Sequence, residues 1–251
     1  HNYHDRTGLI QVYTNDGSNN WVKKGSDIYG KNISSNIGWA PPSISDDGSV
    51  LAFASLTDAD SSGGAGYVYE FRGNEWIEVA NFSGDNNGDV LGRSLTLSGD
   101  GNTFAMGGEG TDYQLRDRGM VKIFREINGK WGQIGDSIYG EGPVDFSGFS
   151  VELSTDGNRL AIGAPFNGKD WHWGGPGHIR IYEYNEDNNS WLKIGQDIDG
   201  LTSTDELGYS VNLSKDGSIV VGAGPRNSNN GDDSGIVYVY EDIDGKWTQL
   251  G

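Results

Sequence analysis

Five tryptophans recur at a near-constant interval and divide the chain into copies of one unit. Successive members of the set are 55, 55, 60 and 56 residues apart: Trp21, Trp76, Trp131, Trp191 and Trp247. Each follows an apolar run that opens on glycine, such as GYVYEF before the second and GIVYVY before the fifth. Self-similarity at this period indicates one supersecondary unit stacked on its neighbours, so the fold must be an array of such units.

Each copy contains four short apolar runs separated by turn residues. In one copy they are SVELS (150–154), RLAIGAP (159–165), HIRIY (178–182) and WLKIG (191–195). Runs this short, without a 3.6-residue period, predict strands rather than helices. An Asp-Gly pair links the first strand to the second, and this pair suits a tight hairpin because both residues accept positive φ. Its glycine recurs in every complete copy: Gly48, Gly101, Gly157 and Gly217.

Four strands per repeat are the pattern of a β-propeller blade. We therefore predict an all-β fold of four-stranded antiparallel blades, a single propeller domain or fragment over residues 1–251. The approximate repeats are a half blade at 1–25 and four full blades at 26–80, 81–135, 136–195 and 196–251. The half blade holds only a third and a fourth strand, so another segment or another copy must complete it. We expect part of a ring of five to seven blades; a β-solenoid is the structural alternative.

The chain is acidic and contains no cysteine. Its 36 acidic and 18 basic residues give a formal net charge of −18, which disfavours nucleic acid because that partner requires a basic surface. The lack of cysteine excludes thiolate chemistry and zinc–thiolate sites. No stretch approaches the ~18 apolar residues of a membrane span, so we expect no membrane insertion.

The stretch FSGFSVELSTDGNRLAIGAP (146–165) resembles the FG-GAP repeat, the blade of integrin α-subunit propellers and their microbial and algal relatives. Similar copies read VLGRSLTLSGDGNTFAMGGE (90–109) and ELGYSVNLSKDGSIVVGAGP (206–225). The subtype looks like tandem repeats in secreted or surface proteins of marine bacteria and protists. The resemblance implies an integrin-like propeller in an extracellular or cell-surface protein, with a role in adhesion.

Calcium-binding members of that family carry Asp-x-Asp-x-Asp-Gly between the first two strands. Here the turn keeps one carboxylate in most copies, and two in the third, Glu152 and Asp156. Calcium requires six to eight oxygens, so we expect no calcium in these turns and no required cofactor. The serines before Asp-Gly are expected to bond local backbone donors instead. The candidate calcium ligands are acid pairs in the loops between second and third strands: Asp58 with Asp60, and Asp232 with Asp233.

The loops between second and third strands differ from blade to blade, which makes them the expected place of function. One loop holds Asp170, Trp171, His172 and Trp173, and these two tryptophans lie outside the repeat positions. Trp39, in contrast, aligns with equivalent aromatic residues of later copies. The loop tryptophans either stack on a sugar ring or dock a protein partner, or they cover the core of a neighbouring blade.

One acidic residue recurs after the fourth strand, as Asp89, Asp145 and Asp205, with Ser35 at the same step in the first copy. Recurrence in every blade favours a structural role, capping the next turn. A glycosidase-like carboxylate pair among these residues is the enzymatic alternative.

Candidate glycosylation sites are Asn32, Asn81 and Asn188, although a chain this rich in asparagine and serine contains such sequons by chance. No nucleophile elbow, phosphate loop or His-rich metal motif is present. The predicted function is a non-enzymatic extracellular or cell-surface module for adhesion, structural assembly or ligand binding, with protein or glycan partners. The alternative is a glycan-binding lectin or glycan-active enzyme with its site on the same loop face.

Overall fold

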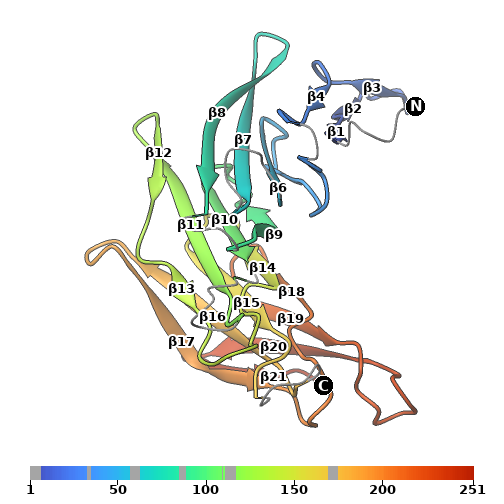
Figure 1. The fold of residues 1–251 in the computed structure, drawn as a ribbon, viewed down its shortest axis with the longest axis vertical. Coiled ribbons are helices and arrows are strands. Elements are labelled where there is room, and N and C mark those ends of the chain that lie inside the picture. The colour runs from blue at the N-terminus through green and yellow to red at the C-terminus, as the bar shows by residue number, and fades with distance from the viewer. Residues whose placement is uncertain are drawn as a thin grey trace.

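The computed structural model describes residues 7–32, 35–56, 63–84, 89–108, 110, 117–168 and 175–251. Within these ranges the chain forms strands and no helix, so it contains no helix that could cross a membrane. Figure 1 shows successive sheets following one another from the N-terminal to the C-terminal end of the chain.

Four sheets contain four consecutive antiparallel strands each, in chain order. Blade 1 is β5 (Ser43–Ile44), β6 (Val50–Ser55), β7 (Ala65–Arg72) and β8 (Glu75–Ser83). Blade 2 is β9 (Leu91–Leu97), β10 (Thr103–Gly108), β11 (Met120–Ile127) and β12 (Lys130–Gln133), with β13 (Ile138–Tyr139) also paired to β11. Blade 3 is β14 (Ser150–Leu153), β15 (Arg159–Ala164), β16 (His178–Asn185) and β17 (Ser190–Asp199). Blade 4 is β18 (Ser210–Leu213), β19 (Ile219–Gly224), β20 (Ile236–Ile243) and β21 (Lys246–Gln249).

A half blade precedes them, built from two strand pairs. It consists of β1 (Leu9–Ile10), β2 (Tyr13–Asn15), β3 (Trp21–Lys23) and β4 (Ile28–Tyr29), in which β1 pairs with β4 and β2 with β3. These sheets confirm the predicted all-β organisation in four-stranded antiparallel blades. The described sheets do not form a closed ring, and the number of blades in a complete ring stays a prediction.

The Asp-Gly turns fold as the sequence predicts. Ser154 Oγ donates a hydrogen bond to the Asp156 carboxylate at 2.6 Å and accepts one from the backbone N–H of Arg159 at 2.9 Å. One hydroxyl group therefore binds both the turn aspartate and the first residue of the second strand. Gly157 follows at φ 67°, in the left-handed region that glycine accepts without steric cost. The same serine-to-aspartate bond recurs in the other blades, at Ser45, Ser98 and Ser214. The turn serines and aspartates are therefore hairpin elements.

The fourth strand is longer than the predicted five-residue run in blades 1 and 3, as β8 and β17 show. In blade 3, β17 continues to Asp199, with a register shift opposite Ile179 and Ile181. In blade 2 the strand is interrupted at Gly135 (φ 66°) and resumes as β13. The residues after Gly135 and Gly195 thus continue to pair with the third strand in blades 2 and 3, because glycine permits a bulge after which pairing continues.

Recurrent tryptophans join the blades. The indole Nε1 of Trp247 in blade 4 donates to the carbonyl of Ile194 in blade 3 at 3.1 Å, and the ring lies against Gly195. A β-carbon at Gly195 would lie 2.7 Å from the indole, so the close approach requires glycine. Equivalent bonds run from Trp76 to the Lys24 carbonyl and from Trp191 to the Ile134 carbonyl. Each of these tryptophans therefore joins its blade to the preceding one by a hydrogen bond from its indole nitrogen.

The apolar core lies between adjacent sheets. Between blades 3 and 4, for example, Ile179 and Ile181 pack with Val211, Val220 and Trp247. A sheet of this kind buries its faces only against neighbouring sheets, which is why the copies depend on one another.

The first strands of the four blades face one another. β9 contacts β5 and β14, and β14 contacts β18. At one end of these strands, the Lys215 ammonium of blade 4 reaches the Asp46 carboxylate of blade 1 at 2.7 Å. The first strands therefore surround a common axis, and whatever lies at their ends collects residues from all four blades.

Candidate functional site

Four equivalent turns present one side chain from each blade at the start of its first strand. These side chains are Trp39, Arg93, Phe149 and Tyr209. Each directly follows a glycine of positive φ: Gly38 (85°), Gly92 (95°), Gly148 (89°) and Gly208 (93°). Because the first strands surround the common axis, the four side chains gather around it.

A second left-handed residue stands two positions before each of these glycines. These residues are Asn36 (φ 49°), Val90 (49°), Phe146 (52°) and Glu206 (55°). The turn closes where the Phe149 N–H donates to the Phe146 carbonyl at 3.0 Å and, in blade 4, where the Tyr209 N–H donates to the Glu206 carbonyl at 3.2 Å. A β-branched valine rarely adopts positive φ, and such strained residues concentrate at ligand sites.

A cavity of about 420 Å³ opens at this position. Its lining comes from all four blades: Trp39, Leu56, Val90, Arg93, Phe146, Phe149, Phe166 and Tyr209. We call it the axial pocket. Its size and its mostly aromatic lining are those of a small-molecule site.

The aromatic side chains of the axial pocket support one another. The Phe149 ring lies 4.7 Å from that of Tyr209 and 6.1 Å from that of Phe166, which in turn meets Phe146 edge-on at 5.3 Å. Trp39 is 66% exposed and Tyr209 44% exposed, although both line the axial pocket. Amphipathic rings held open to solvent suit a ligand that has an apolar face and a polar edge.

A half-buried carboxyl lies in the strand that follows Phe149. Glu152 is in β14, three residues beyond Phe149, and the hydroxyl of Thr96 in β9 hydrogen-bonds to it. Burial raises the pKa of Glu152 to about 7, which the bond from Thr96 opposes only in part. A carboxyl with a pKa near neutrality is suited to proton transfer.

A second group of titratable residues gathers beside β16. Ligand atoms of Glu141, His178 and Asp197 all lie within 4.8 Å of one another, a spacing that fits a metal ion. The Arg180 guanidinium, however, lies 2.6 Å from Asp197 and also pairs with Glu141. Lys193 adds a further cation 2.5 Å from Asp197. A metal would have to displace these cations, so we interpret the cluster as an internal ion-pair network.

We predict that His178 makes the folding stability of the protein sensitive to acid. Burial lowers its pKa to about 4, and neighbouring Arg180 acts in the same direction. Between pH 6.5 and 4 the unfolded chain binds a proton that the folded chain excludes, so stability falls as pH is lowered through this window, by up to about 3 kcal/mol. Urea unfolding of wild type and His178→Gln from pH 7.5 to 4 measures this. The difference between the two proteins must shrink towards acid pH, and a constant difference would contradict the assignment.

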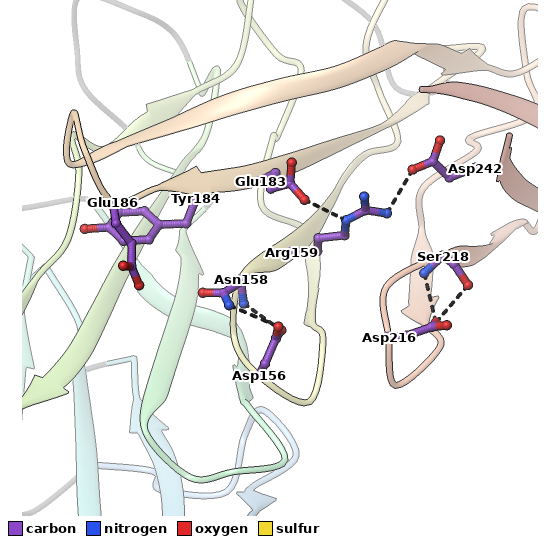
Figure 2. A pocket seen from close by; sticks show the side chains of 9 residues that line it. All are labelled: Asp156, Asn158, Arg159, Glu183, Tyr184, Glu186, Asp216, Ser218 and Asp242. Atoms are coloured by element: carbon purple, nitrogen blue, oxygen red, sulfur yellow. Dashed lines mark hydrogen bonds and ion pairs between the residues drawn. The ribbon is translucent and has the colours of Figure 1, made fainter. Parts of the chain in front are cut away.

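A polar pocket of about 550 Å³ lies between blades 3 and 4, at the Asp-Gly turns (Figure 2). In Figure 2, Arg159 reaches toward Glu183 on its own blade and Asp242 on the next; the N···O distances are 3.1 and 2.9 Å. Asp216 is bonded to Ser218 within its turn. The ion pairs of Arg159 connect blades 3 and 4, and the hydrogen bonds of Asp216 stabilise its turn. We therefore interpret this pocket as part of the interface between the two blades.

Two of the repeated acidic residues, Asp145 and Asp205, cap turns. The Asp205 carboxylate accepts from the N–H groups of Leu201 and Thr202 at 2.8 and 3.0 Å, and Asp145 accepts from the Gly142 N–H at 2.6 Å. These bonds support the structural interpretation over a glycosidase pair.

The other predicted site residues are distributed as follows. Asp58, Asp60, Asp170, Trp171, His172 and Trp173 lie outside the described residues. Asp232 and Asp233 are exposed in the loop before β20, Asn81 and Asn188 are exposed, and Asn32 is half-buried. Ligand binding, calcium binding and glycosylation at these positions stay predictions; melting with calcium and with EDTA tests the calcium sites.

The axial pocket was not predicted as a site. The sequence signals it by the residue after a recurrent glycine, which is aromatic in three copies (Trp39, Phe149 and Tyr209) and Arg93 in the other. Recurrence at this step by itself predicts a structural role. In a propeller, however, a position repeated in each first strand also recurs around the axis.

Comparison with known proteins supports the repeat assignment. Residues 199–240 match the sequence model of the FG-GAP repeat, which confirms the resemblance. No curated protein matches the chain.

Two solved structures share its β-propeller fold. One is described as a candidate 6-phosphogluconolactonase from Bacteroides fragilis (TM-score 0.60, 16% identity, 96% of this chain and 63% of that one covered). The other is a periplasmic gluconolactonase from Pseudomonas aeruginosa (TM-score 0.61, 17% identity, 98% and 64% covered). The chain thus spans less than two thirds of either structure, and identity this low shows the fold alone.

These structures correct the predicted non-enzymatic adhesion module. Both similar structures are described as lactonases, so the fold gives no ground for excluding an enzyme. The prediction of a non-enzymatic module depends on the absence of a nucleophile elbow, a phosphate loop and a His-rich metal motif from the sequence. Such motifs detect sites made by one contiguous segment, whereas a site on a propeller axis takes one residue from each blade.

Proposed function

We propose that this chain carries the substrate site of a β-propeller enzyme that hydrolyses a sugar-derived lactone. The observation that carries the proposal is the axial pocket, to which all four blades contribute and in which Trp39, Phe149 and Tyr209 offer three aromatic side chains. Aromatic rings stack on the apolar face of a sugar ring, while the hydroxyl groups at its edge remain solvated. The lactonase fold of the similar structures adds the reaction class.

We propose Glu152 as the group that transfers the proton. Opening a lactone requires a base that removes a proton from water as it adds to the carbonyl carbon; the acyl C–O bond of the ring then breaks and the ring oxygen takes up the proton. Glu152 is not a lining residue of the axial pocket and lies three residues beyond Phe149, about 10 Å along the strand. We therefore place the lactone carbonyl between Phe149 and Glu152, with the attacking water at the carboxylate. We also propose that the protein lies outside the cytoplasm, because residues 199–240 match the FG-GAP repeat.

The test is hydrolysis of glucono-1,5-lactone, followed by titration of released acid and corrected for the spontaneous rate. We expect turnover by wild type, a loss of roughly tenfold in kcat/KM for Trp39→Ala, and a larger loss in kcat for Glu152→Gln. Trp21→Ala is the matched control, because Trp21 is also exposed but belongs to the half blade.

Calorimetric measurement of sugar binding to wild type and to the three variants separates a loss of substrate binding from a loss of turnover. Hydrolysis that is unaffected by Trp39→Ala would place the site elsewhere. Binding without any turnover, or neither binding nor turnover, would overturn the proposal.

A further inference from the structure

Blade 4 presents an apolar face on the side away from blade 3, and no described blade covers it. Val221 in β19 pairs with Val239 in β20, and Val237 lies on the same face of β20. Val237 is 64% exposed, whereas Ile179, which also stands two residues after the glycine that opens its third strand, is completely buried against blade 4. An open face with the construction of a covered one marks an interaction surface.

Blade 4 also carries the acceptor side of the tryptophan joint. Inside the chain, an indole binds the carbonyl three residues after the tryptophan of the preceding blade, as Trp247 binds that of Ile194 beside Gly195. The corresponding residues of blade 4 are Leu250 and Gly251. Gly251 has φ 79°, and no described atom lies within 4 Å of the position that a β-carbon would take. The backbone at this step is thus already shaped to receive an indole.

The half blade exposes the donor side of the same joint. Trp21 is 69% exposed, whereas Trp76 and Trp247 at the same step of the repeat are 7% and 3% exposed. Tyr13 in β2 is 47% exposed, whereas Tyr240, which likewise stands five residues after the glycine that opens its third strand, packs against the core shared with the preceding blade. Two aromatic side chains of the kind that cover a preceding blade are therefore open to solvent here.

The two surfaces belong to different copies of the chain if they meet. Figure 1 shows the half blade and blade 4 at opposite ends of the array, so the donor and the acceptor surface do not touch within one chain. Tryptophan and tyrosine contribute strongly to protein interfaces, because they bury a large apolar area and keep one polar group for a hydrogen bond. A contact that takes a different surface from each copy is heterologous.

We propose that blade 4 of one copy of the chain binds the half blade of a second copy, head to tail. Trp21 of the second copy donates its indole N–H to the Leu250 carbonyl, as in the joints inside the chain, and Tyr13 packs against the apolar face at Val237. The second copy takes the place that the following blade has in those joints. This contact does not depend on the proposed lactone site.

Sedimentation velocity over a roughly hundredfold range of protein concentration tests the proposal. The weight-average sedimentation coefficient of wild type should rise with concentration. Trp21→Ala and Val237→Asp should each weaken association roughly tenfold or more, because one removes the indole and the other introduces a charge into an apolar contact. The controls are Trp39→Ala and Ile127→Asp, at exposed side chains away from both surfaces, and they should associate like wild type.

Mixing the two interface variants tests whether two different surfaces meet. Trp21→Ala keeps the face of blade 4, and Val237→Asp keeps the half blade, so an equimolar mixture should form 1:1 complexes that neither variant forms alone. Unfolding and lactone hydrolysis are measured on dilute protein, in which the copies are separate, so Trp21→Ala remains a control in those experiments.

Three results would overturn the proposal: wild type that stays monomeric at every concentration, association that survives in both interface variants, and a mixture that stays monomeric. Thermal unfolding of each variant is compared with wild type first. Val237→Lys replaces Val237→Asp if the latter unfolds at a lower temperature, since it also places a charge on the open face.

Discussion

Replacing Trp247 by alanine is expected to lower the free energy of unfolding by about 3–5 kcal/mol, the range for a large aromatic side chain removed from a core. The side chain is only 3% exposed, packs in the core between blades 3 and 4, and donates its indole N–H to the Ile194 carbonyl. Its loss removes this apolar contact and leaves a buried carbonyl without its donor. Urea unfolding monitored by circular dichroism measures the change.

Trp21→Ala is the matched control for this substitution. Trp21 occupies the same step of the repeat but is 69% exposed, so its replacement should alter stability by less than about 0.5 kcal/mol. Gly195→Ala should reproduce much of the Trp247→Ala effect, because the new β-carbon would collide with the indole at a position of φ 67°. Equal losses for Trp21→Ala and Trp247→Ala would contradict the interblade role.

Replacing Glu152 by glutamine is expected to stabilise the protein at high pH. The pKa of Glu152 is raised from 4.5 to about 7, so between these values the folded chain holds a proton that the unfolded chain releases. Stability therefore falls as pH rises through this window, in the direction opposite to the effect of His178. At pH 8 the variant should exceed wild type by up to about 3 kcal/mol, and at pH 4 the two should differ little beyond the change of side chain.

Unfolding of both proteins from pH 4 to pH 8 checks this prediction, with Asp187→Asn, at an exposed carboxylate in the β16–β17 turn, as control. A difference between Glu152→Gln and wild type that does not vary with pH would show that the pKa of this carboxyl is not raised. If the variant is also inactive toward lactone while more stable, the loss cannot be attributed to misfolding.

The five recurrent tryptophans occupy one step of the repeat but not one environment. The spacing of the five tryptophans predicts equal structural roles, but the structure separates them. Trp131 packs edge-on against Phe82 at 6.3 Å, and its indole nitrogen has no partner among the described residues. The preceding copy has Ala80 where Gly25, Gly135 and Gly195 stand in the others, which removes the space that lets the indole reach a carbonyl.

The sequence by itself determined the architecture. A 55-residue period, four short apolar runs and an Asp-Gly turn in each copy permit few folds, because strand and turn preferences act locally and repeat. Turn chemistry at Ser154, Asp156 and Asp205 also followed from it, since those bonds join residues near in the chain.

Only the tertiary structure decided where function can reside. Trp39, Arg93, Phe149 and Tyr209 stand more than 50 residues apart in the sequence and meet because their strands surround one axis. The raised pKa of Glu152 likewise depends on burial among neighbouring first strands. Proximity and desolvation are properties of the folded chain, and no local pattern of residues encodes them.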